Sequence, residues 1–186
     1  MSSLVNKFLD LILNDEPIIV PTDTVYGLVC RYDSKSAVEK IYKLKKRKRK
    51  KPLILLGQNW KALKKFVKIT TRHVKAIHEL PLQWPGPMTI ILPASKTVPK
   101  FLNKGFKTIG IRVPDNKFLL KLLKHSPGKV LASTSANISG KSDRMPQKEL
   151  LKKVKLFVKA KRGEMSLKPS RVIEIKKDKI IILRSK

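Results

Sequence analysis

The feature that most constrains this fold is an alternation of short apolar, β-branched runs with segments of helical periodicity. Runs typical of buried strands lie at 18–20, 52–56, 88–92, 108–113, 129–133, 156–158, 172–175 and 180–183. Segments with apolar residues at helical spacing lie at 3–14, 36–46, 60–68, 71–80, 115–124 and 147–153. This alternation predicts an α/β fold: a twisted, mostly open mixed sheet with flanking helices.

Two of the expected helices begin with capping signals. Ser36 followed by Glu39 predicts a capping box for the helix at 36–46. Asp115 is the expected N-cap of the helix at 115–124. The chain contains no internal repeat and no linker rich in Pro, Gly or Ser, so we expect residues 1–186 to form a single domain.

The charge of the chain is strongly positive. Among 186 residues, 43 Lys and Arg outnumber 13 Asp and Glu, which gives a net charge of +30. A field of this sign favours polyanions such as nucleic acid and nucleotides. The alternative is a lysine-rich coding bias that places lysine on any tolerant surface.

The cysteine and histidine content excludes several kinds of site. Cys30 is the only cysteine, so the chain can form neither an internal disulfide nor a tetracysteine zinc site, and we expect Cys30 to be a small buried hydrophobe. The three histidines lack metal-ligand spacing, so we expect no metal site in the protein. Because no signal-peptide pattern or bilayer-length apolar run is present, the expected location is cytoplasmic.

The string Pro21–Leu28 follows the apolar run at 18–20 and contains two threonines and a glycine. Hydroxyls and free backbone N–H groups at the end of a strand are where α/β sheets bind small polar ligands. The alternative is a β-turn whose threonines bond only to their own backbone.

Arg112 stands inside the apolar run at 108–113. A buried arginine is costly without a partner, and its planar fork suits a carboxylate or a phosphate. An internal ion pair with Asp or Glu is the alternative, and the scarcity of acidic residues favours a bound ligand.

Three further segments carry polar or rigid features. The run Lys43–Lys51 has one apolar member, which predicts an exposed basic segment that either binds anions or is merely solvated. The segment Ser133–Ser142 is rich in hydroxyls; it ends like a Walker A loop but has Ser135 at the first glycine position, and local backbone capping is the alternative. Trp84 precedes Pro-Gly-Pro, a rigid turn, and we expect it to pack in the core.

Taken together, these segments resemble the YrdC-type family, the threonylcarbamoyl-AMP synthases, in its short, single-domain form. The matching strings occur in family order: Pro21–Leu28; Lys45 and Arg47 with Pro52–Ile54; Trp84–Thr89; Thr108–Pro114; Ser133–Gly140; Pro169–Ile173; and Ile182–Arg184. The resemblance implies a YrdC-like sheet with a basic concave surface.

The resemblance also implies an enzyme, a nucleotidyltransferase that makes threonylcarbamoyl-AMP and pyrophosphate from L-threonine, bicarbonate and ATP. A partner transferase then moves the threonylcarbamoyl group onto tRNA. ATP is a substrate, and Mg²⁺ is expected on its phosphates. The alternatives are a non-catalytic RNA-binding domain, which the net charge favours, and a paralogue of uncertain activity; direct binding of tRNA or other RNA is expected through the basic surface.

The family's functional residues map onto this chain by position. L-Threonine is expected to bind at Thr24, Arg112, Ser133 and Ser170. ATP is expected to bind at Lys45, Arg47, Lys51, Thr108, Ser135, Asn137, Ser142 and Arg184, of which Lys45, Arg47, Ser135 and Asn137 form the catalytic signature.

The chain departs from the family pattern at three positions. Lys48 stands where a proline is usual, so Lys43 and Arg49 could exchange roles with Lys45 and Arg47. Leu56 replaces a histidine that some relatives place near the threonine, and Arg171 replaces a small residue next to Ser170.

Overall fold

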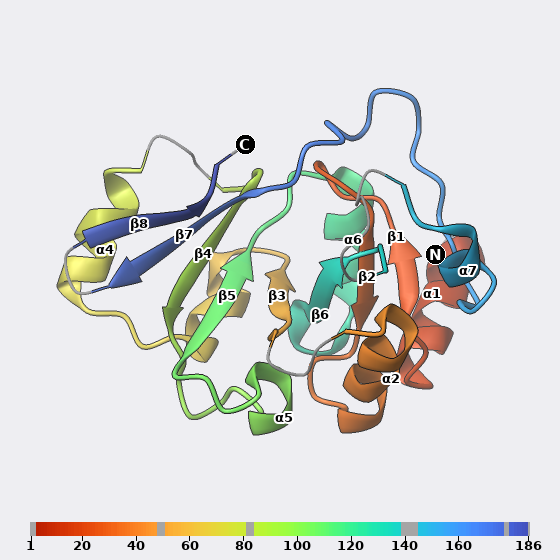
Figure 1. Cartoon of the computed structure of the whole chain (residues 1–186), viewed down its shortest axis with the longest axis horizontal. Coiled ribbons are helices and arrows are strands. Elements are labelled where there is room, and N and C mark those ends of the chain that lie inside the picture. The colour runs from red at the N-terminus through yellow and green to blue at the C-terminus, as the bar shows by residue number, and fades with distance from the viewer. Residues whose placement is uncertain (1–2, 48–50, 81–83, 139–144, 177–178, 186) are drawn as a thin grey trace.

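The computed structural model describes residues 3–47, 51–80, 84–138, 145–176 and 179–185. Its strands form an eight-stranded sheet in the order β1-β2-β6-β3-β5-β4-β7-β8 (Figure 1). The pairs β3–β5 and β4–β7 are parallel and the other neighbouring pairs are antiparallel, which confirms the mixed sheet. The strands are β1 Ile18–Val20, β2 Gly27–Cys30, β3 Ile54–Gly57, β4 Met88–Pro93, β5 Thr108–Arg112, β6 Val130–Ser135, β7 Arg171–Lys176 and β8 Lys179–Arg184.

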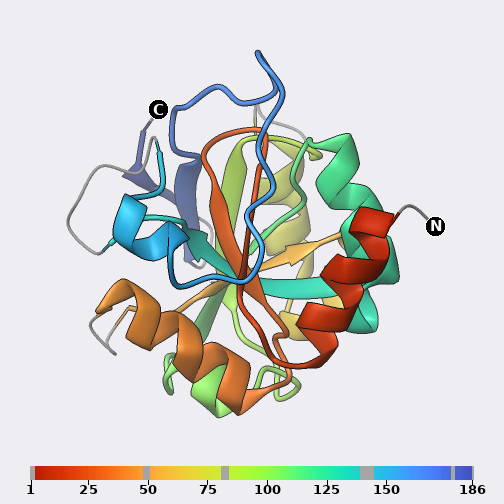
Figure 2. The same cartoon turned by 90° about the vertical axis from the view of Figure 1, so that its right-hand side faces the viewer.

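Helices flank the sheet on both faces, as predicted. They are α1 Ser3–Leu13, α2 Lys35–Lys45, α3 Trp60–Leu63, α4 Thr71–His78, α5 Lys100–Asn103, α6 Lys117–His125 and α7 Lys148–Leu151, with 3-10 turns at Lys64–Phe66 and Pro127–Lys129. Figure 2 shows α1 and α6 on one side of the sheet and α2 on the other. Within the described residues, no helix is long and apolar enough to span a membrane.

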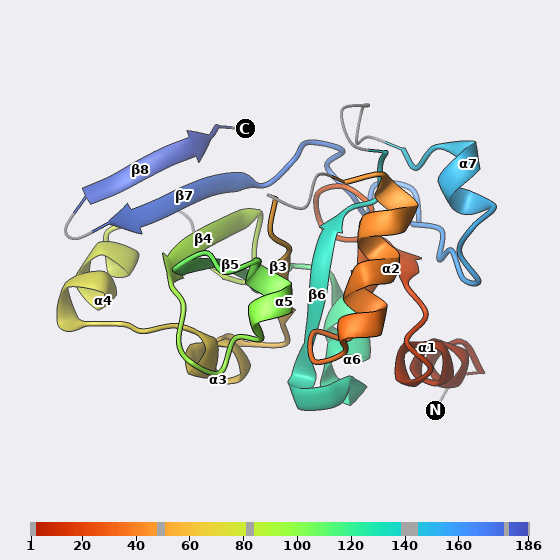
Figure 3. The ribbon, with the colours of Figure 1, turned by 60° about the horizontal axis from the view of Figure 1, so that its bottom comes forward.

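Side-chain alternation along the strands divides the interior into two clusters. Ile18 and Val20 of β1 pack with α1 and α6, whereas Ile19 between them packs with α2. All residues of β1 and β2 are buried, because helices cover both faces there. Figure 3 shows α2 packed across β6, and β7 and β8 lying farther away beyond β4. The sheet is therefore covered on both faces around β1, β2 and β6.

A long connection with no helix or strand links α7 to β7, and we call its residues 152–170 the strap. It runs along β1, where Ile19 N donates to Leu156 O at 3.1 Å and Val158 N donates to Ile19 O at 2.9 Å. The expectation of a strand at 156–158 is therefore wrong: this segment forms only an isolated bridge at Phe157. A single bridge forms because only one residue pair keeps strand geometry before the strap leaves the sheet.

Other differences from the sequence-based expectations are local. The four-residue elements β2 and α5 were not predicted, because such short runs carry little periodicity. The cap of α2 is Ser34 rather than Ser36, and its side chain accepts from Ala37 N at 3.2 Å. The cap of α6 is Asn116 rather than Asp115. In both helices a neighbouring residue in the sequence has the extended backbone that a cap requires.

Cys30 and Trp84 lie where the sequence places them. Cys30 is fully buried, and burial raises the pKa of its thiol far above the usual value. The indole of Trp84 packs against the larger core cluster and donates from Nε1 to Met88 O at 2.8 Å. Both residues therefore act as core residues.

We expect Ser34→Ala to lower the free energy of unfolding by about 1 kcal/mol relative to the parent protein. The reason is that Ser34 Oγ both caps α2 and donates to Asp15 Oδ2 at 2.7 Å. The matched control is Ser36→Ala, an exposed site within the helix, where we expect a change of no more than about 0.5 kcal/mol. Urea titrations monitored by tryptophan fluorescence compare the two; equal losses would contradict the assigned cap.

Candidate functional site

A cleft of about 320 Å³ opens on the face of the sheet that α1 and α6 leave uncovered. Its floor consists of alternate residues of the central strands, because successive side chains in a strand point to opposite faces. In β5 these are Thr108, Gly110 and Arg112. A Cβ at Gly110 would lie 2.8 Å from Ile54 Cγ2, so only glycine fits at this point of the floor.

The turn after β1 forms one wall of the cleft with a chain of hydroxyls. Thr22 Oγ1 donates to Val25 O at 2.7 Å and accepts from Thr24 N at 3.0 Å. Because the hydroxyl proton of Thr22 is used in this way, the 3.0 Å contact between the two hydroxyls is a donation from Thr24 to Thr22. The lone pairs of Thr24 Oγ1 are thereby left to accept from a cation. The alternative of threonines bonded to their own backbone is correct for Thr22, whereas Thr24 reaches another strand.

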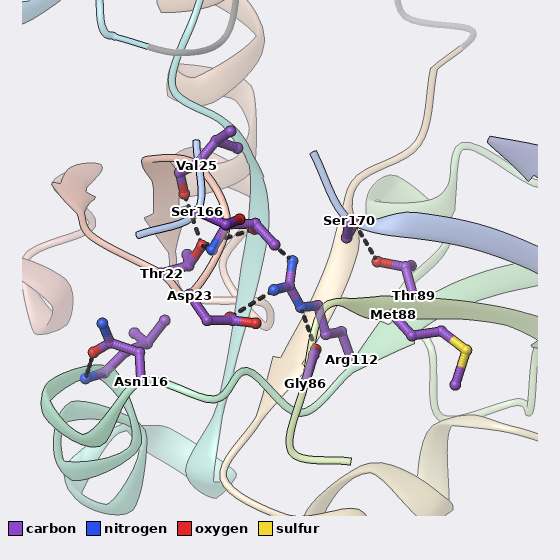
Figure 4. A network of polar contacts seen from close by, with 12 residues as sticks. Thr22, Asp23, Val25, Gly86, Met88, Thr89, Arg112, Asn116, Ser166 and Ser170 are labelled. Atoms are coloured by element: carbon purple, nitrogen blue, oxygen red, sulfur yellow. Dashed lines mark hydrogen bonds and ion pairs between the residues drawn. The ribbon is translucent and has the colours of Figure 1, made fainter. Parts of the chain in front are cut away.

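The guanidinium of Arg112 is the centre of the site, as Figure 4 shows. It donates from Nη1 to Thr24 Oγ1 at 3.0 Å, from Nε to Gly86 O at 3.1 Å and from Nη2 to Asp23 Oδ1 at 2.6 Å. The side chain is only 4% exposed. Burial lowers the pKa of Arg112 below its usual value, and the nearby Asp23 carboxylate partly offsets this. Arg112 thus joins the turn after β1 to the turn before β4.

The ion pair with Asp23 corrects the interpretation of Arg112 from sequence. Scarce acidic residues made an internal partner the less favoured alternative, yet a single well-placed carboxylate suffices. Asp23 Oδ2 is buried and has no hydrogen-bond partner among the described residues. The guanidinium retains N–H donors beyond the three hydrogen bonds it makes here. The internal pair therefore orients Arg112 without using all of its donors.

A second group of polar side chains lies on the β4–β7 side of the cleft. Ser170, at the end of the strap, contacts Thr89 Oγ1 through its hydroxyl at 3.1 Å. Arg184 of β8 donates from Nη2 to Ser170 Oγ at 3.1 Å and from Nε to Ser170 O at 2.8 Å. The edge strand β8 is exposed along its length, yet its last residue thereby places a guanidinium on the cleft.

Lys45 is buried, which contradicts the expectation that the whole basic run is exposed. Only 1% of its surface is accessible. Its Nζ donates to the carbonyl of Ser135 and, at 2.9 Å, to Asn137 Oδ1. Ser135 Oγ donates to the same Asn137 oxygen at 2.7 Å. The Lys-x-Arg and Ser-x-Asn signatures, some 90 residues apart in the chain, therefore meet in space.

Arg47 lies half-buried at the edge of the cleft and braces the backbone at Lys51 and Pro52. It donates from Nε to Lys51 O and from Nη2 to Pro52 O, both at 3.0 Å. Tyr42 OH also donates to Lys51 O, at 2.8 Å. Burial lowers the pKa of Arg47, and interactions with Tyr42 oppose that shift. Lys51 contributes its backbone carbonyl to this bracing, and its side chain is exposed.

The structure brings most of the sequence-predicted residues to one cleft. Lys45 and Asn137 lie behind its wall in contact with Ser135, and Lys51 lies outside its lining. Of the possible role exchanges, Lys43 is exposed whereas Lys45 is buried. Arg49 and Ser142, and with them the end of the Walker A-like string, fall outside the described residues. The predicted residues that line the cleft are Thr24, Arg47, Thr108, Arg112, Ser133, Ser135, Ser170 and Arg184.

Three residues of the site were not identified from sequence. Asp23 and Thr22 stand inside the motif of the first turn, and Thr89 stands in the segment that opens β4. Their place in the motifs could have indicated them, but nothing in the sequence shows which side chains of a turn face the sheet. In the described part of the chain, no group of three or more His, Cys, Asp or Glu side chains is placed to hold a metal ion.

Comparisons with known proteins give consistent results. A family model for Sua5, YciO and YrdC proteins, described as "Telomere recombination", matches residues 10–185. Threonylcarbamoyl-AMP synthases of Escherichia coli O6:H1 and Shigella boydii serotype 18 are 38% identical over 130 residues, which is 69% of this chain and 68% of each relative.

Solved structures of similar proteins share the fold. P. abyssi Sua5 complexed with L-threonine is 28% identical, with a TM-score of 0.82 over 97% of this chain. The present chain spans about half of that protein, 53% of its length. E. coli YciO is 26% identical with a TM-score of 0.82, over 98% of this chain and 88% of YciO.

We expect Asp23→Asn to lower the free energy of unfolding by about 3 kcal/mol, because it leaves the buried Arg112 cation without its counter-charge. The matched control is Asp33→Asn, which weakens the more exposed Arg31–Asp33 pair and should cost less than about 1 kcal/mol. Both values come from chemical denaturation at neutral pH. A loss at Asp23 no larger than that at Asp33 would show that the buried pair does not stabilise the fold.

Proposed function

The chain belongs to the Sua5/YciO/YrdC family, and from this premise we propose that it is a threonylcarbamoyl-AMP synthase. Its substrates are L-threonine, bicarbonate and ATP, and its products are threonylcarbamoyl-AMP and pyrophosphate. The observation that carries the proposal is the Arg112–Thr24 contact at the floor of a polar cleft, in a chain 38% identical to synthases of that name. Residues 1–186 act as one catalytic domain in this proposal.

Threonine binds at the Arg112 end of the cleft. The remaining N–H groups of Arg112 donate to the substrate carboxylate as a charge-assisted pair. The hydroxyls of Thr24, Ser133 and Ser170 surround this position, and each of these side chains is at most 5% exposed. Their burial supports a small ligand held by few, well-oriented groups.

ATP binds at the cations Lys45, Arg47 and Arg184. Arg47 and Arg184 line the cleft from opposite ends of the chain, and Lys45 supports Ser135 and Asn137 from behind. These cations compensate the charge of the phosphates. The complete set assigned to ATP is Lys45, Arg47, Lys51, Thr108, Ser135, Asn137, Ser142 and Arg184.

The reaction requires positioning more than covalent help from the protein. The threonine nitrogen bonds to the carbon of bicarbonate with loss of water, which gives a carbamate. An oxygen of that carbamate attacks the α-phosphorus, the bond from this phosphorus to the bridging oxygen breaks, and pyrophosphate leaves. Arg112, Arg47 and Arg184 all line the same cleft, and their positive charges bring the two anions together.

Mg²⁺ fits this site only as an ion held by the ATP phosphates and water. The described residues offer no cluster of carboxylates to cage it, and Mg²⁺ characteristically binds substrate phosphates with few protein ligands. When bound it neutralises phosphate charge, and the positioning described above is done by the side chains of the chain itself.

The product is an activated acyl group, so a second enzyme must consume it. We place that step in the modification of tRNA, where a transferase moves the threonylcarbamoyl group onto an adenosine base. This assigns the protein to the cytoplasm, where tRNA is modified. Weak direct contact with tRNA or other RNA through the basic surface is part of the proposal.

A second candidate is a non-catalytic RNA-binding domain of the same fold, which the net charge of +30 favours. Incubation of the pure protein with ATP, bicarbonate and threonine separates the two. Mass spectrometry should detect threonylcarbamoyl-AMP, and pyrophosphate release should depend on threonine. An absence of both products would reject the synthase and favour the RNA-binding domain or an inactive paralogue.

We expect Arg112→Ala to weaken threonine binding by about 2–4 kcal/mol, because the charge-assisted pair with the carboxylate is lost. ATP affinity should change much less. Arg112→Lys keeps the positive charge but lacks the planar fork of N–H donors, so its threonine affinity should lie between those of the parent and the alanine variant. Calorimetry with each ligand on folded protein measures both affinities, and unchanged threonine affinity in Arg112→Ala would remove Arg112 from the threonine site.

We expect Arg47→Ala to lower turnover by at least about 100-fold, since it removes a cleft cation that serves the transition state. Lys43→Ala removes the same charge from an exposed position on the preceding helical turn, and should change turnover by less than about twofold. Turnover is measured at matched ionic strength. Equal losses of turnover in the two variants would mean that the basic run acts through its overall positive charge and that Arg47 has no specific role.

A further inference from the structure

A second cleft, of about 610 Å³, lies across the turn after β1 from the first cleft. Pro21 lines the second cleft and Thr22 lines the first, so one short turn separates them. The other walls are the beginning of α6, Leu4 of α1 and the strap. Figure 2 shows the strap running past the region where α1 and α6 lie.

The second cleft combines an apolar wall with an aromatic ring. Leu4, Pro21, Phe118 and Val158 line it. Phe118 is half-buried against the α1–α6 cluster, so its ring is anchored while part of it still faces the cleft. An anchored aromatic ring beside aliphatic groups is a surface on which a planar base can stack.

The rim of this cleft is positively charged. Its cations are Lys117 and, on the strap, Lys159, Lys161 and Arg162, all exposed. None of them forms an ion pair with a carboxylate in the described residues. The carboxylate of Glu164 is engaged by Asn116 Nδ2 at 2.9 Å and by Lys161 N at 2.6 Å. The carboxylates that line the cleft are Asp115 and Glu164, and that of Glu164 is already bound within the fold. Four cations therefore face two carboxylates.

We propose that the second cleft binds a nucleotide unit of single-stranded nucleic acid, with the base against Phe118 and phosphates at Lys161 and Arg162. The volume suits one base with its sugar. Cations on both α6 and the strap exceed what one monophosphate requires, and this favours a strand with successive phosphates over a free nucleotide. This site is separate from the proposed synthase site, and its test does not depend on synthase activity.

The test measures binding of a fluorescein-labelled single-stranded RNA by anisotropy across a salt series. The double variant Lys161→Glu/Arg162→Glu should lose affinity by about tenfold or more at low salt. Loss of two phosphate contacts should also reduce the slope of log affinity against log salt by about 1.4, because each contact to a single strand contributes about 0.7.

The matched control is Lys61→Glu/Lys64→Glu, which makes the same change in net charge at exposed positions on α3 and the turn after it. It should reduce affinity by less than about threefold, through the long-range field alone. Equal losses in the two double variants, or no RNA binding by the parent protein at low salt, would overturn the proposal. Circular dichroism confirms that the variants are folded.

Two further measurements test whether a base stacks on Phe118 and whether the bound nucleotide belongs to a strand or is free. Phe118→Leu retains an apolar side chain in the core but removes the stacking face, and should reduce RNA affinity by about fivefold or more. Unchanged affinity in this variant would overturn the base contact. Excess AMP should leave most of the labelled RNA bound, and full displacement by AMP would assign the cleft to a free nucleotide instead of a strand.

Discussion

The buried guanidinium of Arg112 is the interaction on which the candidate site depends. A cation removed from water must be compensated, and here the compensation comes from a carboxylate, a hydroxyl and a carbonyl on two separate turns. Those bonds fix the turn after β1 against the turn before β4. The strap is tied to the same place, because Ser166 N donates to Asp23 O and Leu167 N donates to Thr24 O. Compensation of one charge thus organises three segments around the cleft.

Lys45 is also a buried cation of the site, and groups of another kind compensate its charge. Lys45 donates to the carbonyl of Ser135, the last residue of β6, and to the amide oxygen of Asn137 just after it. An ammonium can bond neutral oxygens from several directions, whereas a guanidinium requires acceptors in its plane. The two cations therefore suit different tasks: Arg112 can orient a planar carboxylate, and Lys45 can fix the segment that we propose to face the phosphates.

Much of the fold was predictable because strand and helix periods are properties of local sequence. The position of Lys45 was also readable: Ala37, Val38, Ile41 and Tyr42 form the buried face of α2, and Lys45 continues it one turn later. The burial of Lys45 was not predicted, because the basic run Lys43–Lys51 was interpreted as one exposed segment. The Arg112–Asp23 pair was not readable, since it joins residues 89 positions apart and depends on which way a turn side chain points.

The turn after β1 separates the two clefts. The turn after β1 has Pro21 on the side of the second cleft and Thr22 and Thr24 on the side of the first. The strap crosses beside it and contributes to both: residues 158, 159 and 161–164 line the second cleft, and Pro169 and Ser170 line the first. Backbone hydrogen bonds join strap and turn, because Ser166 N donates to Asp23 O and Leu167 N donates to Thr24 O between the two sets of lining residues.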